Sequence, residues 1–92
     1  MVQEQAEMVG IQALGWLAGQ EERMNRFLAI SGVDINNLKQ NAADPEFLGA
    51  VLDFVLSEDA AVRAFCDAFG LNYTDPMEAR QSLPGGAVVN WT

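Results

Sequence analysis

Apolar residues recur at the three- and four-residue spacing of an α-helix through almost the whole chain, and a glycine or a capping residue marks each interruption. The pattern predicts helices over about residues 5–18, 21–31, 34–43, 45–56, 57–69 and 75–83. Gly32 and Gly70 end the second and fifth of these, because glycine takes the left-handed conformation at no steric cost. The sequence therefore predicts an all-α fold, a compact bundle of five to six short helices.

The apolar stripes predict which helix faces form the core. The fourth helix has the broadest stripe, and its Glu46, Gly49, Asp53 and Ser57 fall on the opposite side. We expect the fourth and fifth helices to be central. The predicted core positions of the first, fourth and fifth helices are Met8, Ile11, Leu14, Leu17 and Ala18, then Phe47, Leu48, Val51, Leu52, Val55 and Leu56, then Val62, Phe65, Cys66 and Phe69.

Polar residues before three of the helices predict how those helices begin. Asp34 can cap the third helix, and Asp44 followed by Pro45 can cap the fourth. Asp75, Pro76 and Glu78 have the spacing of a capping box for the sixth helix. Residues 1–86 then form a single helical domain, and residues 87–92, apolar and without periodicity, form a C-terminal tail that we expect to be mobile.

A shift of 38 residues aligns the chain with itself and suggests two duplicated helical-hairpin halves. Core positions, helix starts and glycine stops coincide, including Gly32 with Gly70, whereas Leu38 opposite Pro76 breaks the register. The aligned positions are 13, 14, 16, 17, 18, 21, 24, 27, 28, 32, 33 and 34 with 51, 52, 54, 55, 56, 59, 62, 65, 66, 70, 71 and 72. The duplication is a hypothesis, because any two helical hairpins share apolar periodicity.

Charge and composition exclude several function classes. Thirteen acidic residues against five basic ones give a net charge of −8, which disfavours binding to nucleic acid or to an anionic membrane. An acidic mimic of DNA is a minor alternative. The chain has no histidine and one cysteine, so it can form neither an intramolecular disulfide, nor a Cys/His zinc site, nor a histidine-dependent triad. An acidic N-terminus and the lack of a long apolar run favour a cytoplasmic protein.

The chain resembles a family of small, all-helical bacterial proteins that is classed only as a domain of unknown function. The resemblance is carried by IQALGWLA (11–18), RFLAISG (26–32), DPEFL (44–48), VLDF (51–54), AR (79–80) and LPGG (83–86). It covers nearly all of residues 9–86 and implies a helical, cytoplasmic protein. It implies no activity, because that family supplies no catalytic or binding residues to carry over.

The candidate chemical groups each have a simpler structural explanation. Asp53 lies between two apolar residues that could raise its pKa, but its helix face favours an exposed acid or a partner for Arg23 or Arg63. The acids at 21–22 and 58–59 could bind a divalent cation, yet both pairs open helices, where the helix dipole explains them. Cys66 falls on an apolar stripe, which is typical of a buried, unreactive thiol. We therefore predict no catalytic residue, no metal and no cofactor.

Aromatic residues give the candidates for contact with a partner. Trp16 and Phe54 lie at stripe edges, where they are either lids on the core or anchors for another protein. Val88, Val89 and Trp91 follow a Gly-Gly break, so they either fold back over the helices or contact another chain. We expect a non-enzymatic, acidic protein–protein interaction module with an unidentified protein partner. The alternatives are a small-molecule-binding protein or enzyme with a pocket between helices, and a homo-oligomer.

Overall fold

The chain is all-helical, as its apolar periodicity predicts. The computed structural model describes residues 1–84, and within that range it contains helices and no β-strand. The elements are α1 (Gln3–Ala18), α2 (Glu21–Ser31), the 3₁₀ turn η1 (Ile35–Asn37), α3 (Leu38–Asn41), α4 (Pro45–Leu56), α5 (Asp59–Phe69) and α6 (Asp75–Gln81). The third predicted helix is therefore divided, because the Asp34 carboxylate accepts a hydrogen bond from the Asn36 backbone N–H and stabilises a tighter first turn.

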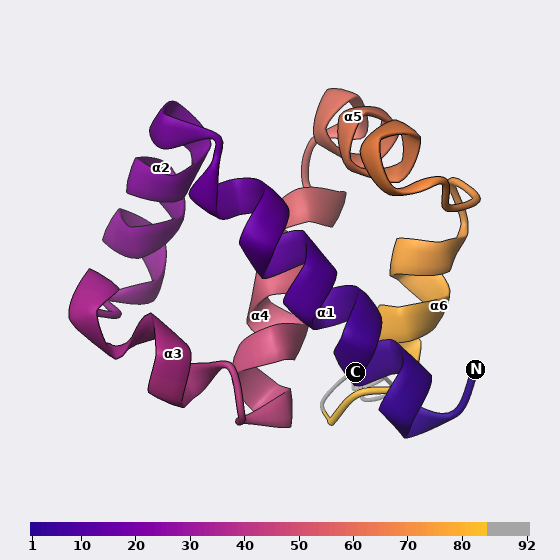
Figure 1. The fold of residues 1–92 in the computed structure, drawn as a ribbon, viewed down its shortest axis with the longest axis horizontal. Coiled ribbons are helices and arrows are strands. Elements are labelled where there is room, and N and C mark those ends of the chain that lie inside the picture. Colours follow the sequence, from indigo (N-terminus) through magenta and orange to yellow (C-terminus); the bar gives the residue numbers. More distant parts are fainter. Residues whose placement is uncertain (85–92) are drawn as a thin grey trace, which may run out of the picture.

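Two long helices cross at the centre of the molecule. α1 passes in front of α4, with α2 and α3 on one side and α5 and α6 on the other (Figure 1). α4 is central, as predicted, because it packs against α1, α2, α5 and α6. The prediction that α5 shares this position is wrong, because α1, which packs against α2, α4, α5 and α6, takes it. At the crossing, a Cβ atom added to Gly10 would lie only 2.9 Å from Cβ of Leu48, which shows how closely the two backbones approach.

The face that α1 turns to the core agrees with the predicted one at Leu14 and Leu17 and differs from it in the N-terminal half. Its buried residues are Ala6, Val9, Gly10, Ala13, Leu14 and Leu17. Met8 and Ile11 were expected inside but are 61% and 51% exposed. The prediction placed the larger apolar residues inward, whereas this helix also buries small residues at positions 6, 10 and 13, of which Gly10 meets Leu48 of α4. Phe69, also predicted in the core, is 40% exposed at the end of α5.

The helix ends agree with the predicted caps except at α6. Gly32 and Gly70 have φ angles of 73° and 67°, in the left-handed region that favours glycine. The Asp44 carboxylate accepts a hydrogen bond from the Glu46 backbone N–H, as predicted. The predicted capping box at Asp75 is wrong, because Asp75 is the first residue of α6 and its carboxylate accepts instead from the Asn72 backbone N–H in the preceding loop.

Several structural features repeat at the 38-residue spacing. α1 and α4 end at Ala18 and Leu56, and α2 and α5 run over Glu21–Ser31 and Asp59–Phe69. The Trp16 ring packs on Phe65 with ring centroids 5.9 Å apart, and the positions 38 residues away from these, Phe54 and Phe27, are 5.5 Å apart. Gly10 likewise meets Leu48, its own equivalent. These coincidences agree with two related hairpins, and the duplication stays a prediction.

Candidate functional site

An open apolar groove of about 350 Å³ lies between α2 and α4. Seven residues line it: Phe27, Ile30, Ser31, Ala50, Asp53, Phe54 and Ser57. Phe27 and Phe54 form its base, while Ile30 at its rim is 75% exposed. The hollow is open to solvent rather than enclosed, and its lining is mainly apolar.

Edge-to-face aromatic contacts form the base of the groove. The Phe27 ring packs edge-to-face against Phe54 on one side and Phe47 on the other, with centroid distances of 5.5 and 5.7 Å. The Arg26 guanidinium lies 5.8 Å from the centroid of the Phe54 ring. Phe54 thus belongs to the base of the groove and also packs, partly buried, against the core.

One carboxylate lies at the edge of the groove, held by α6. Oδ1 of Asp53 accepts a hydrogen bond of 2.6 Å from Nε of Arg80, so the expected partners Arg23 and Arg63 were wrong. The Arg80 side chain is only 18% exposed because it lies along Gly49, and this contact buries a glycine that was predicted on the outer face of α4. The Asp53 side chain remains 58% exposed, so its carboxylate can accept a further hydrogen bond from a docked group.

A second cluster of charges lies where α2 meets the start of α5. Oε1 of Glu58 accepts hydrogen bonds from Nε of Arg23 at 3.1 Å and from Nη2 of Arg26 at 3.4 Å. The Arg23 hydrogen bond is the main cause that lowers the pKa of the Glu58 carboxyl below its usual value. Arg23 also lies 5.5 Å from the centroid of the Trp16 ring. Trp16, packed between Arg23 and Phe65, is half-buried and closes the core at this point.

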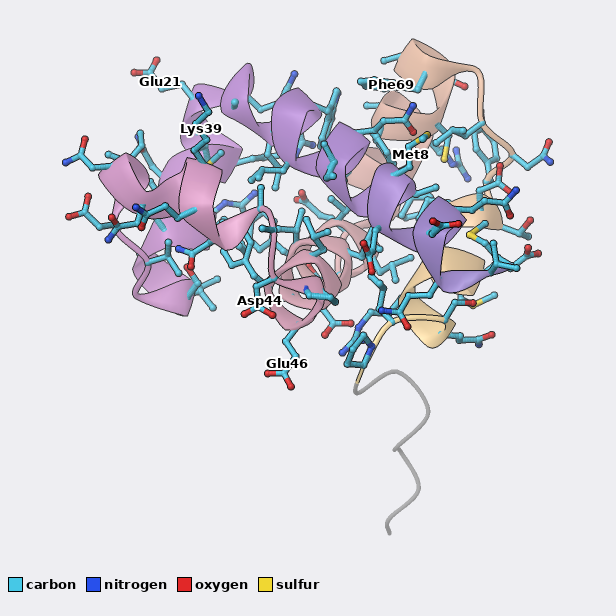
Figure 2. The ribbon with its side chains drawn as sticks, turned by 60° about the horizontal axis from the view of Figure 1, so that its bottom comes forward. Met8, Glu21, Lys39, Asp44, Glu46 and Phe69 are labelled. Atoms are coloured by element: carbon cyan, nitrogen blue, oxygen red, sulfur yellow. The ribbon has the colours of Figure 1, made fainter. Side chains whose placement is uncertain are left out.

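The other acidic residues lie mostly in the first turns of helices. They are Glu4, Glu21, Glu22, Glu46, Asp59, Asp75 and Glu78. Glu46, beside the cap Asp44, points away from the body of the molecule (Figure 2). Among residues 1–84, no three cysteine, aspartate or glutamate side chains are arranged to hold a metal ion. No helix in the same range is both long and apolar enough to cross a membrane.

Cys66 behaves as the buried thiol that its position predicts. Its side chain is 0% exposed, and Sγ donates a hydrogen bond to the Asn72 carbonyl oxygen. Burial raises the pKa of the thiol, with smaller contributions from the negative charges of Asp75 and Asp67. A neutral, covered thiol is a poor nucleophile.

The sequence-based candidates are divided by the structure. Phe54 lines the groove, Trp16 lies away from the groove lining, and Val88, Val89 and Trp91 lie outside the described residues. Sequence reasoning missed Ile30, whose spacing of three from Phe27 places both residues on one face of α2. That spacing was the available signal, but Ile30 lies in the last turn of α2, two residues before the helix stop at Gly32.

Fold and site together define a small all-helical protein with an open apolar groove and an acidic surface. Over residues 3–86 the chain matches a family described as protein of unknown function (DUF3572), and it belongs to that family. The family resemblance expected from the sequence is thereby confirmed. No curated protein and no solved structure matches the chain.

Proposed function

We propose that this protein is a non-enzymatic interaction module that binds an apolar segment of another protein in the α2–α4 groove. The observation that carries the proposal is the combination of an aromatic base, Phe27 and Phe54, with an Ile30 rim that is 75% exposed. An apolar segment that covers Ile30 and the hollow would remove their apolar surface from water, and this burial would favour binding.

The charges favour a partner segment that also carries a basic residue. Asp53 presents a partly exposed carboxylate at the groove edge, where a lysine or arginine beside the docked apolar side chain could pair with it. The net charge of −8 would accelerate association with such a partner and would repel an acidic one or a nucleic acid. The inserted side chain would supply most of the affinity, and the ion pair would fix its orientation.

Photo-crosslinking from inside and outside the groove tests this proposal. A photoreactive residue replaces Ile30 in the full chain, and the matched control replaces Ile35, a 58% exposed isoleucine that does not line the groove. We expect capture of a protein from position 30 and not from position 35, with the crosslink on an apolar segment that contains a lysine or arginine.

The captured protein must then bind when it is purified. We expect Ile30→Asp to weaken binding tenfold or more, a loss of about 1.4 kcal/mol, because it places a charge against the inserted apolar group. Ile35→Asp should leave the affinity unchanged. Equal capture from both positions, crosslinking only to a second copy of the chain, or an unchanged affinity of Ile30→Asp would each refute the proposal.

A further inference from the structure

The chain carries its own candidate occupant for the groove. Residues 85–92 read Gly-Gly-Ala-Val-Val-Asn-Trp-Thr, so they bring two valines and a tryptophan and no charged side chain. They follow directly on Pro84, the last residue that the structure describes. The inference below uses the groove of the proposed function but concerns an intramolecular contact, which is tested separately from partner binding.

The starting point of this segment is connected to the groove by two hydrogen bonds. Nη1 of Arg80 donates to the Pro84 carbonyl oxygen at 3.1 Å, and Nε of the same guanidinium donates to Asp53, which lines the groove. Leu83 is 3% exposed, so the chain is packed against the core up to one residue before the exposed Pro84. One arginine therefore holds both the base of the segment and the edge of the groove.

Length and charge fit the same occupant. At about 3.3 Å per extended residue, residues 85–91 reach about 23 Å, which approaches the 25 Å shortest dimension of the molecule. Gly85 and Gly86 permit the turn that a return over α4 requires. Because the segment has no charged side chain, its side chains can approach a protein of net charge −8 without charge repulsion.

We propose that the segment 87–91 docks in the α2–α4 groove of its own chain, with Val88, Val89 or Trp91 against Phe27, Ile30 and Phe54. In this state the segment covers the groove, and a partner must displace it. In the isolated protein the segment then occupies the groove. Only the fraction of molecules with a free groove can bind a partner, and the apparent affinity is lowered in proportion to that fraction.

Trp91 fluorescence tests the contact. The chain has two tryptophans, and Trp16→Phe leaves Trp91 as the only one in an otherwise full-length protein. We expect the Trp91 emission of the native protein to be blue-shifted, and to be quenched less by acrylamide, than that of the same protein in urea. Ile30→Asp should abolish both effects, and Ile35→Asp should leave them, with circular dichroism confirming that both variants are folded.

Each other outcome overturns the inference. Trp91 emission that already matches the urea state shows that the segment is not docked, and burial that Ile30→Asp leaves intact shows that it docks elsewhere. If Trp91 is buried only at protein concentrations at which sedimentation detects a dimer, the segment of a second copy occupies the groove. None of these results decides partner binding, which crosslinking from position 30 measures independently.

Discussion

Replacing Gly10 by alanine tests the close crossing of α1 and α4 on which the fold depends. The added Cβ would lie 2.9 Å from Cβ of Leu48 and 3.5 Å from its Cγ and Cδ2, whereas carbon atoms prefer about 3.5–4.0 Å. Because the nearest atom is fixed to the backbone of α4, the helices must separate. Overpacking of this kind costs about 1–3 kcal/mol, and the better helix propensity of alanine returns about 1 kcal/mol. We expect a net loss of about 1 kcal/mol.

Gly15→Ala in the same helix is the matched control. Gly15 is exposed and an added Cβ would meet nothing within 4 Å, so this variant should gain about 0.5–1 kcal/mol from helix propensity alone. The difference between the variants then isolates the overpacking cost. Thermal unfolding followed by circular dichroism should place Gly10→Ala several degrees below Gly15→Ala, at about 4–8 °C per kcal/mol. A Gly10→Ala protein as stable as Gly15→Ala would refute the close crossing.

Three further substitutions or reactions test the charged and buried groups. Glu58→Gln should lower the melting temperature at pH 7, because it removes the ionised carboxylate that pairs with Arg23 and Arg26. Folding lowers the pKa of Glu58 below 4.5, so the ionised carboxylate stabilises the folded state at higher pH, and this stabilisation is lost as the pH falls through the folded pKa. The melting temperatures of the two proteins should therefore converge in acid. Gly49→Ala brings a Cβ to 2.9 Å from Nη1 of Arg80, but this guanidinium is the end of a flexible side chain and can move. Urea titration should therefore show a smaller loss of stability than Gly10→Ala causes. The Cys66 thiol should react with an aromatic disulfide reagent far more slowly in the native state than in urea, and rapid stoichiometric reaction of the native protein would contradict its burial.

The helices were predictable from the sequence, but the way they pack was not. Periodicity and the glycine stops at Gly32 and Gly70 report local backbone preferences, and the structure agrees with them within a few residues. The orientation of α1 depends on Gly10 meeting Leu48, a long-range contact between a residue with no side chain and one 38 positions away. Ranking residues by hydrophobicity places Met8 inward and overlooks the helix face formed by the small residues at positions 6, 10 and 13. Hydrophobicity does not indicate how closely two helices can approach each other.

The candidate site was partly predictable for a related reason. Phe54 stood out as an aromatic residue at a stripe edge, and it lines the groove. The groove itself depends on Ile30 from α2 and Asp53 from α4, which only the tertiary fold brings together. The Arg80 partner of Asp53 could not be chosen from the sequence, because five basic residues were available and the choice depends on where α6 packs.

The 38-residue spacing allows the groove beside Phe54 to be compared with the equivalent surface beside Trp16. The positions equivalent to Phe54 and Ser31 are Trp16 and Phe69, and the Phe69 ring packs on Phe65 with centroids 5.2 Å apart, so aromatic volume occupies the related surface. Ser31 leaves the corresponding space beside Phe27 open.

Ser31→Phe should therefore place a ring on Phe27 as Phe69 lies on Phe65, and fill the groove without adding a charge. We expect a melting temperature no lower than that of the parent protein, together with loss of crosslinking from position 30 and of Trp91 burial. Ala29→Phe, at an exposed position of the same helix that does not line the groove, should preserve both signals. If Ser31→Phe keeps the native fold and also keeps partner capture and Trp91 burial, the groove is not the surface that receives them.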